Sequence, residues 1–359
     1  MMWLKKINPQ LILDAIMVIF VLVLPFSKAL PNIFIIPASL FYFYSIFKFK
    51  KIELSVTWII LFVLVIFILV GAVFHDQLLS EVNFQKKFVT GLLVFILINQ
   101  VKQKTLIEYS IVVSCTVVII FNIIYGLYKI NSGIDLDLSD GGKVYEFLTI
   151  HRPYFAFMTV LSAYFMLKWI RSGKSKWFYG LVLFTIGFCF FISAKMGIIL
   201  HIFILCHHFF KSLNKFTFKH FSILAILGTI LVISLIYNPN LRKRLRVQTN
   251  IETTIEKFKE YEIRTIIWDC SLELLDNKWL FGVKTHDNLV PLLTDCYLSK
   301  INPDLKPKKY EYYKTEKFNT HNQFLDIWLI AGIPGLLLLL SLFVIPFFRQ
   351  DEYKDMRML

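Results

Sequence analysis

The sequence Thr320-His321-Asn322-Gln323-Phe324-Leu325-Asp326-Ile327-Trp328-Leu329-Ile330-Ala331-Gly332-Ile333-Pro334-Gly335 joins a long polar segment to a strongly apolar one. Thr320 and Gln323 have the spacing of a capping box, so we expect a helix to begin here with His321 in its first turn. The positive end of that helix disfavours a charged imidazole and attracts phosphate. A neutral His321 can accept a proton as a general base. The alternative interpretation is a histidine that only marks a membrane boundary.

The two glycines at the end of this stretch, Gly332 and Gly335, are three residues apart. On one continuous helix they share a face, and small residues at this spacing let a second helix pack closely. We therefore expect Gly332 and Gly335 to form a helix-packing face.

The composition is that of an integral membrane protein. Of the 359 residues, 57% are hydrophobic and 18% are charged, and the mean hydropathy is +0.62. A soluble domain of this size carries more charge, and many apolar runs approach the roughly 20 residues that span a bilayer. We therefore expect an all-α, polytopic transmembrane helix bundle in which residues 1–359 form a single integral membrane domain.

Ten apolar runs predict about ten crossings: 11–27, 32–47, 55–74, 88–99, 106–128, 153–170, 177–192, 196–210, 221–238 and 322–348. An even number of crossings places both termini on one side. The short links on that side hold more than twice as many Lys and Arg residues as those on the other. The positive-inside rule therefore places both termini in the cytoplasm and residues 239–320 in a large periplasmic loop. The net charge of +14 then reflects basic loops beside anionic lipid, and no nucleic-acid partner is expected.

The large outer loop has recognisable parts. Apolar residues at helical spacing predict an amphipathic helix over 253–276, which carries Arg264. Residues 302–318 are rich in Lys and Tyr and are expected to be an exposed loop. Cys270 and Cys296 share the oxidising side, where they either form a disulfide or remain free thiols. No set of cysteines or histidines has metal-ligand spacing, so neither a metal nor a cofactor is expected.

Four features of the outer side are expected to meet in the bundle: His151, Arg152 and Tyr154 at the mouth of the sixth helix, Lys195 between the seventh and eighth, Arg264, and His321. Fixed cations around one histidine suit a reaction on a lipid diphosphate. The cations bind the diphosphate and stabilise the charge that develops as it leaves. His321 takes the proton of the attacking hydroxyl. Each cation also has a purely structural interpretation, as a side chain that marks a membrane boundary or contacts headgroups.

These residues resemble the O-antigen ligase and polymerase superfamily of bacterial envelope glycosyltransferases. The family signature is His, then Asn, Ser or Gln, nine residues, Gly, two residues and Gly, and it is similar to His321-Asn322 followed by Gly332-Ile333-Pro334-Gly335. Ser193-Ala194-Lys195-Met196-Gly197 resembles the family's Ser-Arg-Gly turn. Arg264 to Trp268, followed by Trp279-Leu280-Phe281-Gly282, is similar to its arginine-tryptophan helix. The ligase-like region covers residues 150–345.

The resemblance implies a metal-independent, inverting transferase that takes glycan from an undecaprenyl-diphosphate donor. It implies that His321 is the catalytic base and that Arg264 and Lys195 bind the diphosphate. Arg152, His151, Tyr154 and Asn322 complete the expected substrate-binding set. Lysine stands at position 195 where the family usually has arginine, and lysine lacks the same bidentate contact.

The subtype suggested is an O-antigen ligase with lipid A–core as acceptor, in the bacterial inner membrane, with a periplasmic active site. A repeat-unit polymerase and a protein O-oligosaccharyltransferase use the same kind of donor and remain open alternatives. A transporter or flippase of lipid-linked sugars is the rival from another class. Few ionisable groups lie in the helix interiors, which argues against transport, and the exceptions are Asp14 and Asp326.

Overall fold

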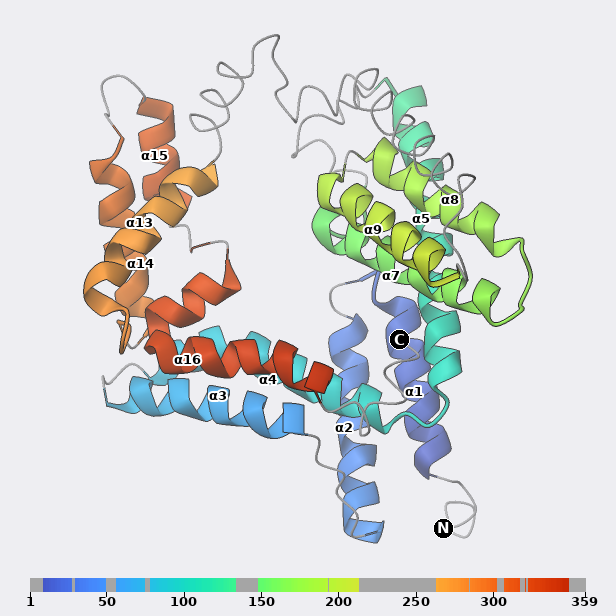
Figure 1. Cartoon of the computed structure of the whole chain (residues 1–359), viewed down its shortest axis with the longest axis horizontal. Helices are drawn as coiled ribbons and strands as arrows, with labels where there is room; N and C mark the ends of the chain where they lie inside the picture. Colours follow the sequence, from blue (N-terminus) through green and yellow to red (C-terminus); the bar gives the residue numbers. More distant parts are fainter. Residues whose placement is uncertain are drawn as a thin grey trace. The chain divides into compact units, whose positions relative to one another are not determined.

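The computed structural model describes residues 9–27, 30–49, 56–74, 78–133, 148–192, 194–212, 263–283, 285–301, 307–316, 320 and 322–348. In these ranges all regular secondary structure is helical, as the sequence predicts (Figure 1). The chain divides into two compact units. One comprises residues 1–50 and 100–249, and the other comprises residues 51–99 and 250–359.

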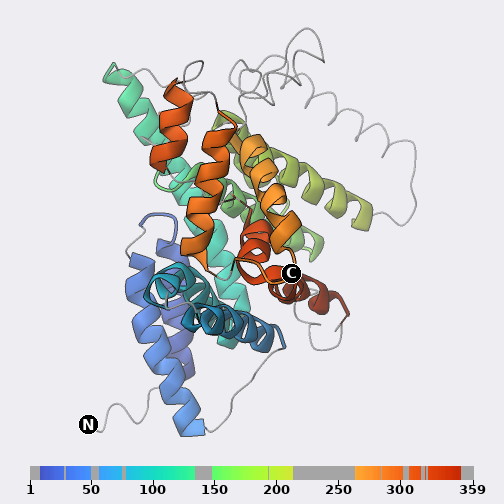
Figure 2. The ribbon, with the colours of Figure 1, turned by 90° about the vertical axis from the view of Figure 1, so that its left-hand side faces the viewer.

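The described helices of the first unit are α1 (Pro9–Val23), α2 (Leu30–Phe49), α5 (Lys104–Asn131), α7 (Arg152–Arg171), α8 (Phe178–Phe191) and α9 (Lys195–Ser212). Helix α1 packs against α2 and α5, and the three lie side by side in Figures 1 and 2. Helix α7 packs against α5, α8 and α9, and the four share apolar cores. Short links make α8 antiparallel to both of its neighbours, so α7 and α9 run in the same direction.

Two buried carboxylates of the first unit accept hydrogen bonds from parts of the chain that are distant in the sequence. Asp14 of α1 accepts a hydrogen bond from the backbone N–H of Lys102, directly before α5, at 3.2 Å. Glu108 of α5 accepts hydrogen bonds from Lys168 Nζ at 2.6 Å and Trp169 Nε1 at 2.9 Å, at the end of α7. Because both charges have partners within the protein, they stabilise the helix ends that they join.

The helices of the second unit are α3 (Val56–Val73), α4 (Leu78–Gln100), α13 (Ile263–Lys278), α14 (His286–Ser299), α15 (Pro307–Glu316) and α16 (Gln323–Phe348). Helix α16 packs along α3 (Figure 1). Helices α13 and α14 pack against α16, and α15 packs against α14. The expected amphipathic stripe lies on α13, where Ile267 and Cys270 are fully buried in the core shared with α16.

The expected number of about ten crossings is not confirmed. Three described helices, α5, α7 and α16, are long and apolar enough to cross a membrane, and six further apolar helices are shorter. Helix α4 already begins at Leu78, ten residues before the start of the apolar run expected over 88–99. The predicted run 221–238 lies outside the described residues.

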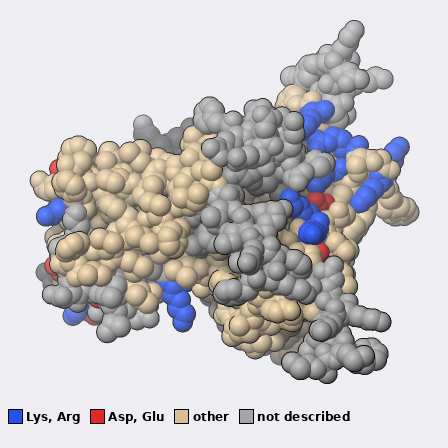
Figure 3. Space-filling model, turned by 90° about the horizontal axis from the view of Figure 1, so that it is seen from below, with Lys and Arg blue, Asp and Glu red and all other residues tan. Residues whose placement is uncertain are grey.

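Large apolar side chains on the helix surfaces support a membrane location. Ile36 and Leu40, one turn apart on α2, are each 64% exposed. Figure 3 shows one face of the molecule, where broad areas carry no Lys, Arg, Asp or Glu side chain. An aqueous surface rarely carries so much apolar area, whereas lipid solvates it.

The segment expected to be an exposed loop, 302–318, contains the helix α15. Tyr313 is fully buried, and its ring meets that of Tyr297 edge-on with 5.5 Å between centroids. Tyr310 packs against the same core. The prediction of an exposed loop was wrong because it rested on the many lysines. Tyr310 and Tyr313 have the i, i+3 spacing of one helix face.

Candidate functional site

The glycine Gly332 breaks α16. Its φ of 65° and ψ of −166° lie in a region that essentially only glycine adopts. The chain that follows α13 pairs with α16 on both sides of the break. Val283 N–H donates to the carbonyl of Leu329 at 2.7 Å, and Ile333 N–H donates to the carbonyl of Trp279 at 3.0 Å. These contacts satisfy backbone groups that the broken helix leaves without helical partners.

Two glycines permit this backbone contact. A Cβ at Gly332 would overlap the carbonyl of Leu280, and a Cβ at Gly282 would lie 2.5 Å from the carbonyl oxygen of Ile330. The predicted helix-packing face is therefore wrong, because Gly332 meets the turn that follows α13 and a Cβ at Gly335 would meet side chains of α16 itself. The sequence motifs at 279–282 and 332–335 are structural partners.

The N-terminus of α16 is capped by Asn322. Its Oδ1 accepts the N–H of Phe324 at 3.0 Å, and its carbonyl accepts the N–H of Asp326 at 2.9 Å. The capping box expected at Thr320 is therefore wrong, and position 321 precedes the helix. His321 itself lies outside the described residues.

Arg264 belongs to the same unit as the signature. It is exposed in the first turn of α13, one turn before Trp268. The Trp268 indole Nε1 donates to the carbonyl oxygen of Thr320 at 3.1 Å. The helix that carries Arg264 is thus hydrogen-bonded to the residue directly before His321.

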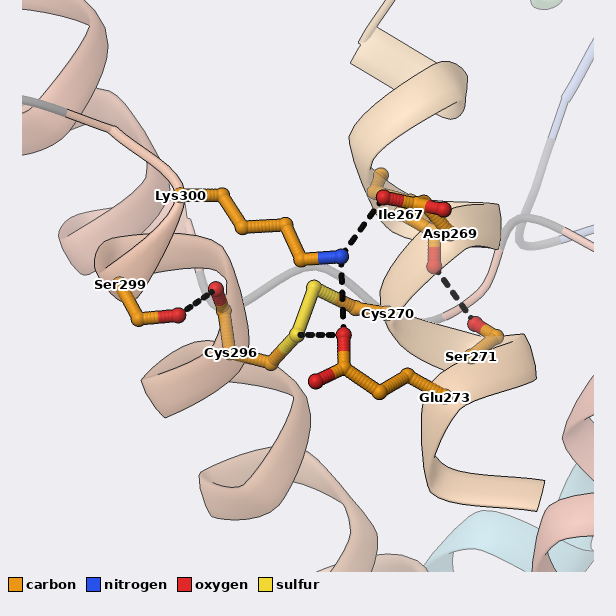
Figure 4. The surroundings of a disulfide bond; sticks show 8 residues. All are labelled: Ile267, Asp269, Cys270, Ser271, Glu273, Cys296, Ser299 and Lys300. Atoms are coloured by element: carbon orange, nitrogen blue, oxygen red, sulfur yellow. Dashed lines mark hydrogen bonds and ion pairs between the residues drawn. A yellow bond between two sulfur atoms is a disulfide. The ribbon is translucent and has the colours of Figure 1, made fainter. Parts of the chain in front are cut away.

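A disulfide between Cys270 and Cys296 fixes α13 to α14 (Figure 4). Of the two alternatives left by the sequence, the paired one is observed. Beside the disulfide, Lys300 Nζ lies 2.6 Å from an Asp269 carboxylate oxygen and 2.9 Å from a Glu273 oxygen. These hydrogen bonds and ion pairs raise the pKa of Lys300.

In the first unit, His151 is the N-cap residue of α7. Its carbonyl accepts hydrogen bonds from the N–H groups of Tyr154 (3.0 Å) and Phe155 (3.1 Å). The Tyr154 side chain is 70% exposed, and its ring faces that of His151 edge-on at 6.4 Å. The rings of His151 and Tyr154 therefore lie at the N-terminal end of α7.

Arg152, the first residue of α7, is only 7% exposed. Its Nε and Nη2 have no hydrogen-bond partner among the described residues, and neither does the buried Oγ1 of Thr149. Burial of a guanidinium without a hydrogen-bond acceptor costs free energy. The buried carboxylates of this unit, Asp14 and Glu108, avoid this cost because each has hydrogen-bond partners. The orphaned nitrogen atoms fit an anionic ligand.

The N-termini of α7 and α9 lie side by side. A Cβ on Gly197 would lie 2.8 Å from Cβ of Ala156, so the first turns of the two helices touch. Lys195 is the first residue of α9, and its side chain lies outside the described set. Two parallel helix starts add their positive ends to the charge of Arg152, and this arrangement favours phosphate.

The predicted site residues fall into two groups. His151, Arg152, Tyr154 and Lys195 belong to the first unit, whereas Arg264, His321 and Asn322 belong to the second. Within the described ranges, no three His, Cys, Asp or Glu side chains lie close enough to hold a metal ion. The predicted site residues do not include Thr149, Thr320, Trp268 or Asp326. The only signal for Asp326 was a carboxylate in a strongly apolar run.

Comparison with known proteins gives one match. Residues 180–340 match the family described as O-antigen ligase. No curated protein and no solved structure matches the chain. The matched region contains the start of α9, all of α13 to α15 and the signature from His321 to Gly335, including the two motifs that pair at the α16 break. Over residues 180–340, somewhat less than half of its length, the chain is thus similar to the O-antigen ligase family.

Proposed function

We propose that this membrane glycosyltransferase of the ligase/polymerase type moves glycan from undecaprenyl diphosphate to an acceptor hydroxyl of lipid A–core. The observation that carries the proposal is the buried Arg152 guanidinium, whose Nε and Nη2 lack acceptors among the described residues. A diphosphate supplies several acceptor oxygens and compensating charge. The adjoining starts of α7 and α9 favour the same ligand.

The proposed chemistry is a single displacement without a metal. The acceptor oxygen attacks the anomeric carbon from the face opposite the diphosphate, so the configuration inverts. The bond from that carbon to the diphosphate oxygen breaks, and undecaprenyl diphosphate leaves. His321 takes the acceptor proton, and Arg152, Lys195 and Arg264 stabilise the charge on the leaving diphosphate.

The location of the reaction follows from the second unit. Disulfides persist in oxidising compartments, so the bond between Cys270 and Cys296 supports a periplasmic position for α13 and α14. We therefore place the protein in the bacterial inner membrane with both termini cytoplasmic and His321 on the periplasmic side. Trp268 links α13 to Thr320, which supports a shared location for Arg264 and His321.

The substitution Arg152→Gln tests the proposal in proteoliposomes that contain an undecaprenyl-diphosphate-linked glycan and lipid A–core. We expect kcat/KM for the donor to fall about 10²- to 10³-fold, as for loss of one donor to a developing anion. The unliganded variant should be as stable as the wild type or more stable, because an unpaired buried charge is removed. Thermal unfolding in detergent measures the second quantity.

Arg171→Gln is the matched control, because Arg171 lies exposed at the other end of α7. Undiminished transfer by Arg152→Gln would contradict the proposed diphosphate contact. Product analysis distinguishes the subtypes: glycan on lipid A–core identifies a ligase, a ladder on undecaprenol a polymerase, and glycan on protein hydroxyls an oligosaccharyltransferase. Counter-flow of lipid-linked sugar with no new glycosidic bond would identify a flippase instead.

A further inference from the structure

The turn that follows α13 exposes large apolar side chains at three successive positions. Trp279, Leu280 and Phe281 are 49%, 39% and 60% exposed. All three lie in the second unit, directly after Lys278, the last residue of α13. A turn that faces water is normally polar, and a run of three exposed apolar residues is not expected there unless it has a function. The composition of this turn therefore indicates an apolar surrounding.

The backbone of the turn has hydrogen-bond partners on α16. Ile333 N–H donates to the carbonyl oxygens of Trp279 at 3.0 Å and of Leu280 at 3.3 Å. The indole Nε1 of Trp328 also donates to the carbonyl oxygen of Trp279, at 3.0 Å. Non-helical backbone is tolerated at membrane depth only where the protein satisfies its polar groups. Because these carbonyls are satisfied, they do not oppose entry of the turn into a bilayer.

The length of α16 beyond its break places the turn near a membrane boundary. The segment after Gly332, from Ile333 to Phe348, is about 24 Å long at a rise of about 1.5 Å per residue. The hydrocarbon core of a bilayer is about 30 Å thick. A charged residue, Arg349, directly follows this segment in the sequence, and charged side chains are costly in the hydrocarbon core. A crossing that ends there leaves the break, and the turn bonded to it, at the opposite boundary.

The helices of the same unit expose the same kind of side chain. Leu337, on α16 after the break, is 59% exposed, and Phe62, on the adjoining α3, is 52% exposed. Acyl chains solvate such surfaces, and indole rings such as that of Trp279 are enriched at both membrane boundaries. Lys278 fits the same place, because a lysine stem can lie along apolar surface while its ammonium group reaches the headgroups.

We propose that Trp279, Leu280 and Phe281 form a membrane anchor, which enters the bilayer where headgroups meet acyl chains. The partner is the lipid itself: acyl chains receive the three side chains, and lipid phosphates attract Lys278. The anchor holds the C-terminal end of α13 at a fixed depth, and with it α14, which the disulfide joins to α13. The proposal is independent of the transferred glycan and of the catalytic base.

Spin labelling of the full chain in vesicles of phosphatidylethanolamine and phosphatidylglycerol tests the anchor. A nitroxide is attached at Phe281→Cys or at Trp279→Cys. The background is Cys206→Ser, because the other two free cysteines are buried. Unsubstituted background protein measures any labelling of those two.

Two further variants supply the reference environments. Leu337→Cys, on the exposed apolar surface of α16, is the reference for acyl chains. Thr315→Cys, exposed in the last turn of α15, is the reference for water. Molecular oxygen concentrates in the hydrocarbon, whereas a neutral nickel chelate stays in water. We expect the label at 281 to respond to oxygen as strongly as the label at 337, and to lose the chelate response that the label at 315 shows.

The label at 279 should show the same preference for oxygen, so the result does not depend on one variant. A chelate response at 279 and 281 equal to that at 315 would place the turn in water and overturn the anchor. Protection of both labels from oxygen and from the chelate would show that protein covers the turn, and this result would also overturn it.

Discussion

Among the residues that the structure describes, Arg152 differs from the other buried charges of its unit because its Nε and Nη2 atoms have no acceptor. Glu108 is paired with Lys168, and Asp14 receives backbone N–H groups. Asp326 likewise binds Thr320. Asp14 and Asp326, the two ionisable residues in apolar runs, therefore bind other parts of the protein. The group that a ligand can bind is the cation Arg152. This pattern fits recognition of an anionic donor better than movement of protons.

The sequence identified Arg152 as a residue at a helix mouth, but it did not predict its burial. Burial depends on α5, α8 and α9, which surround α7 through contacts between distant parts of the chain. For Trp268 and Asp326, nothing in the sequence indicates that they share the partner Thr320. Hydrogen bonds across 52 residues leave no trace in local periodicity.

The pair Cys270 and Cys296 allows a prediction about single residues. Replacing both with Ser should lower the free energy of unfolding by about 3–4 kcal/mol, because the disulfide closes a loop of 26 residues in the unfolded chain. Chemical denaturation of the purified protein, with and without reductant, measures the change. Cys206→Ser is the control, since Cys206 is a free cysteine. If the double variant were as stable as the wild type, the disulfide would not have the stabilising role. The same conclusion would follow if reductant did not change the stability of the wild type.

At the scale of elements, helical periodicity predicted a helix over 253–276, and α13 (Ile263–Lys278) confirms its second part, while residues 253–262 lie outside the described residues. It failed for α15, where two tyrosines supply the buried face, and it could not predict the break in α16. The apolar run from Gln323 to Phe348 contains Gly and Pro residues, but its sequence still predicts one continuous helix. The break becomes intelligible only when the chain after α13 is seen to pair with it.

Gly332→Ala tests the break in α16. A side chain at this φ and ψ is strained, and it would also overlap the carbonyl of Leu280, so we expect stability to fall by more than about 2 kcal/mol. Turnover should fall as well, because α13 would be displaced from α16. Thermal unfolding and the transfer assay measure the two effects.

Gly187→Ala is the control for this experiment. Gly187 lies in α8, and a Cβ there has no heavy atom within 4 Å. Alanine should be neutral or slightly stabilising in a helix, by up to about 1 kcal/mol. Equal effects of the two alanine substitutions would show that the close backbone contact at Gly332 is unimportant.

At the scale of the whole molecule, the sequence was sufficient for the helical class, the membrane character and the similarity to the O-antigen ligase family. Composition and one spaced signature carry those conclusions, and neither requires tertiary contacts. The grouping of the site residues into two units could not be predicted, because each unit combines segments from distant parts of the chain. Residues 51–99 belong with the C-terminal helices, since α3 provides part of the core against which α16 packs.

The central claim is that His321 is the base in glycan transfer from a lipid diphosphate. The most direct measurement is the rate of glycosidic bond formation in proteoliposomes by His321→Ala and by wild type, at equal amounts of monodisperse protein. The account predicts that the wild type forms inverted product without added metal, and that His321→Ala forms none while it still binds donor. Product formation by His321→Ala at the wild-type rate would contradict the claim.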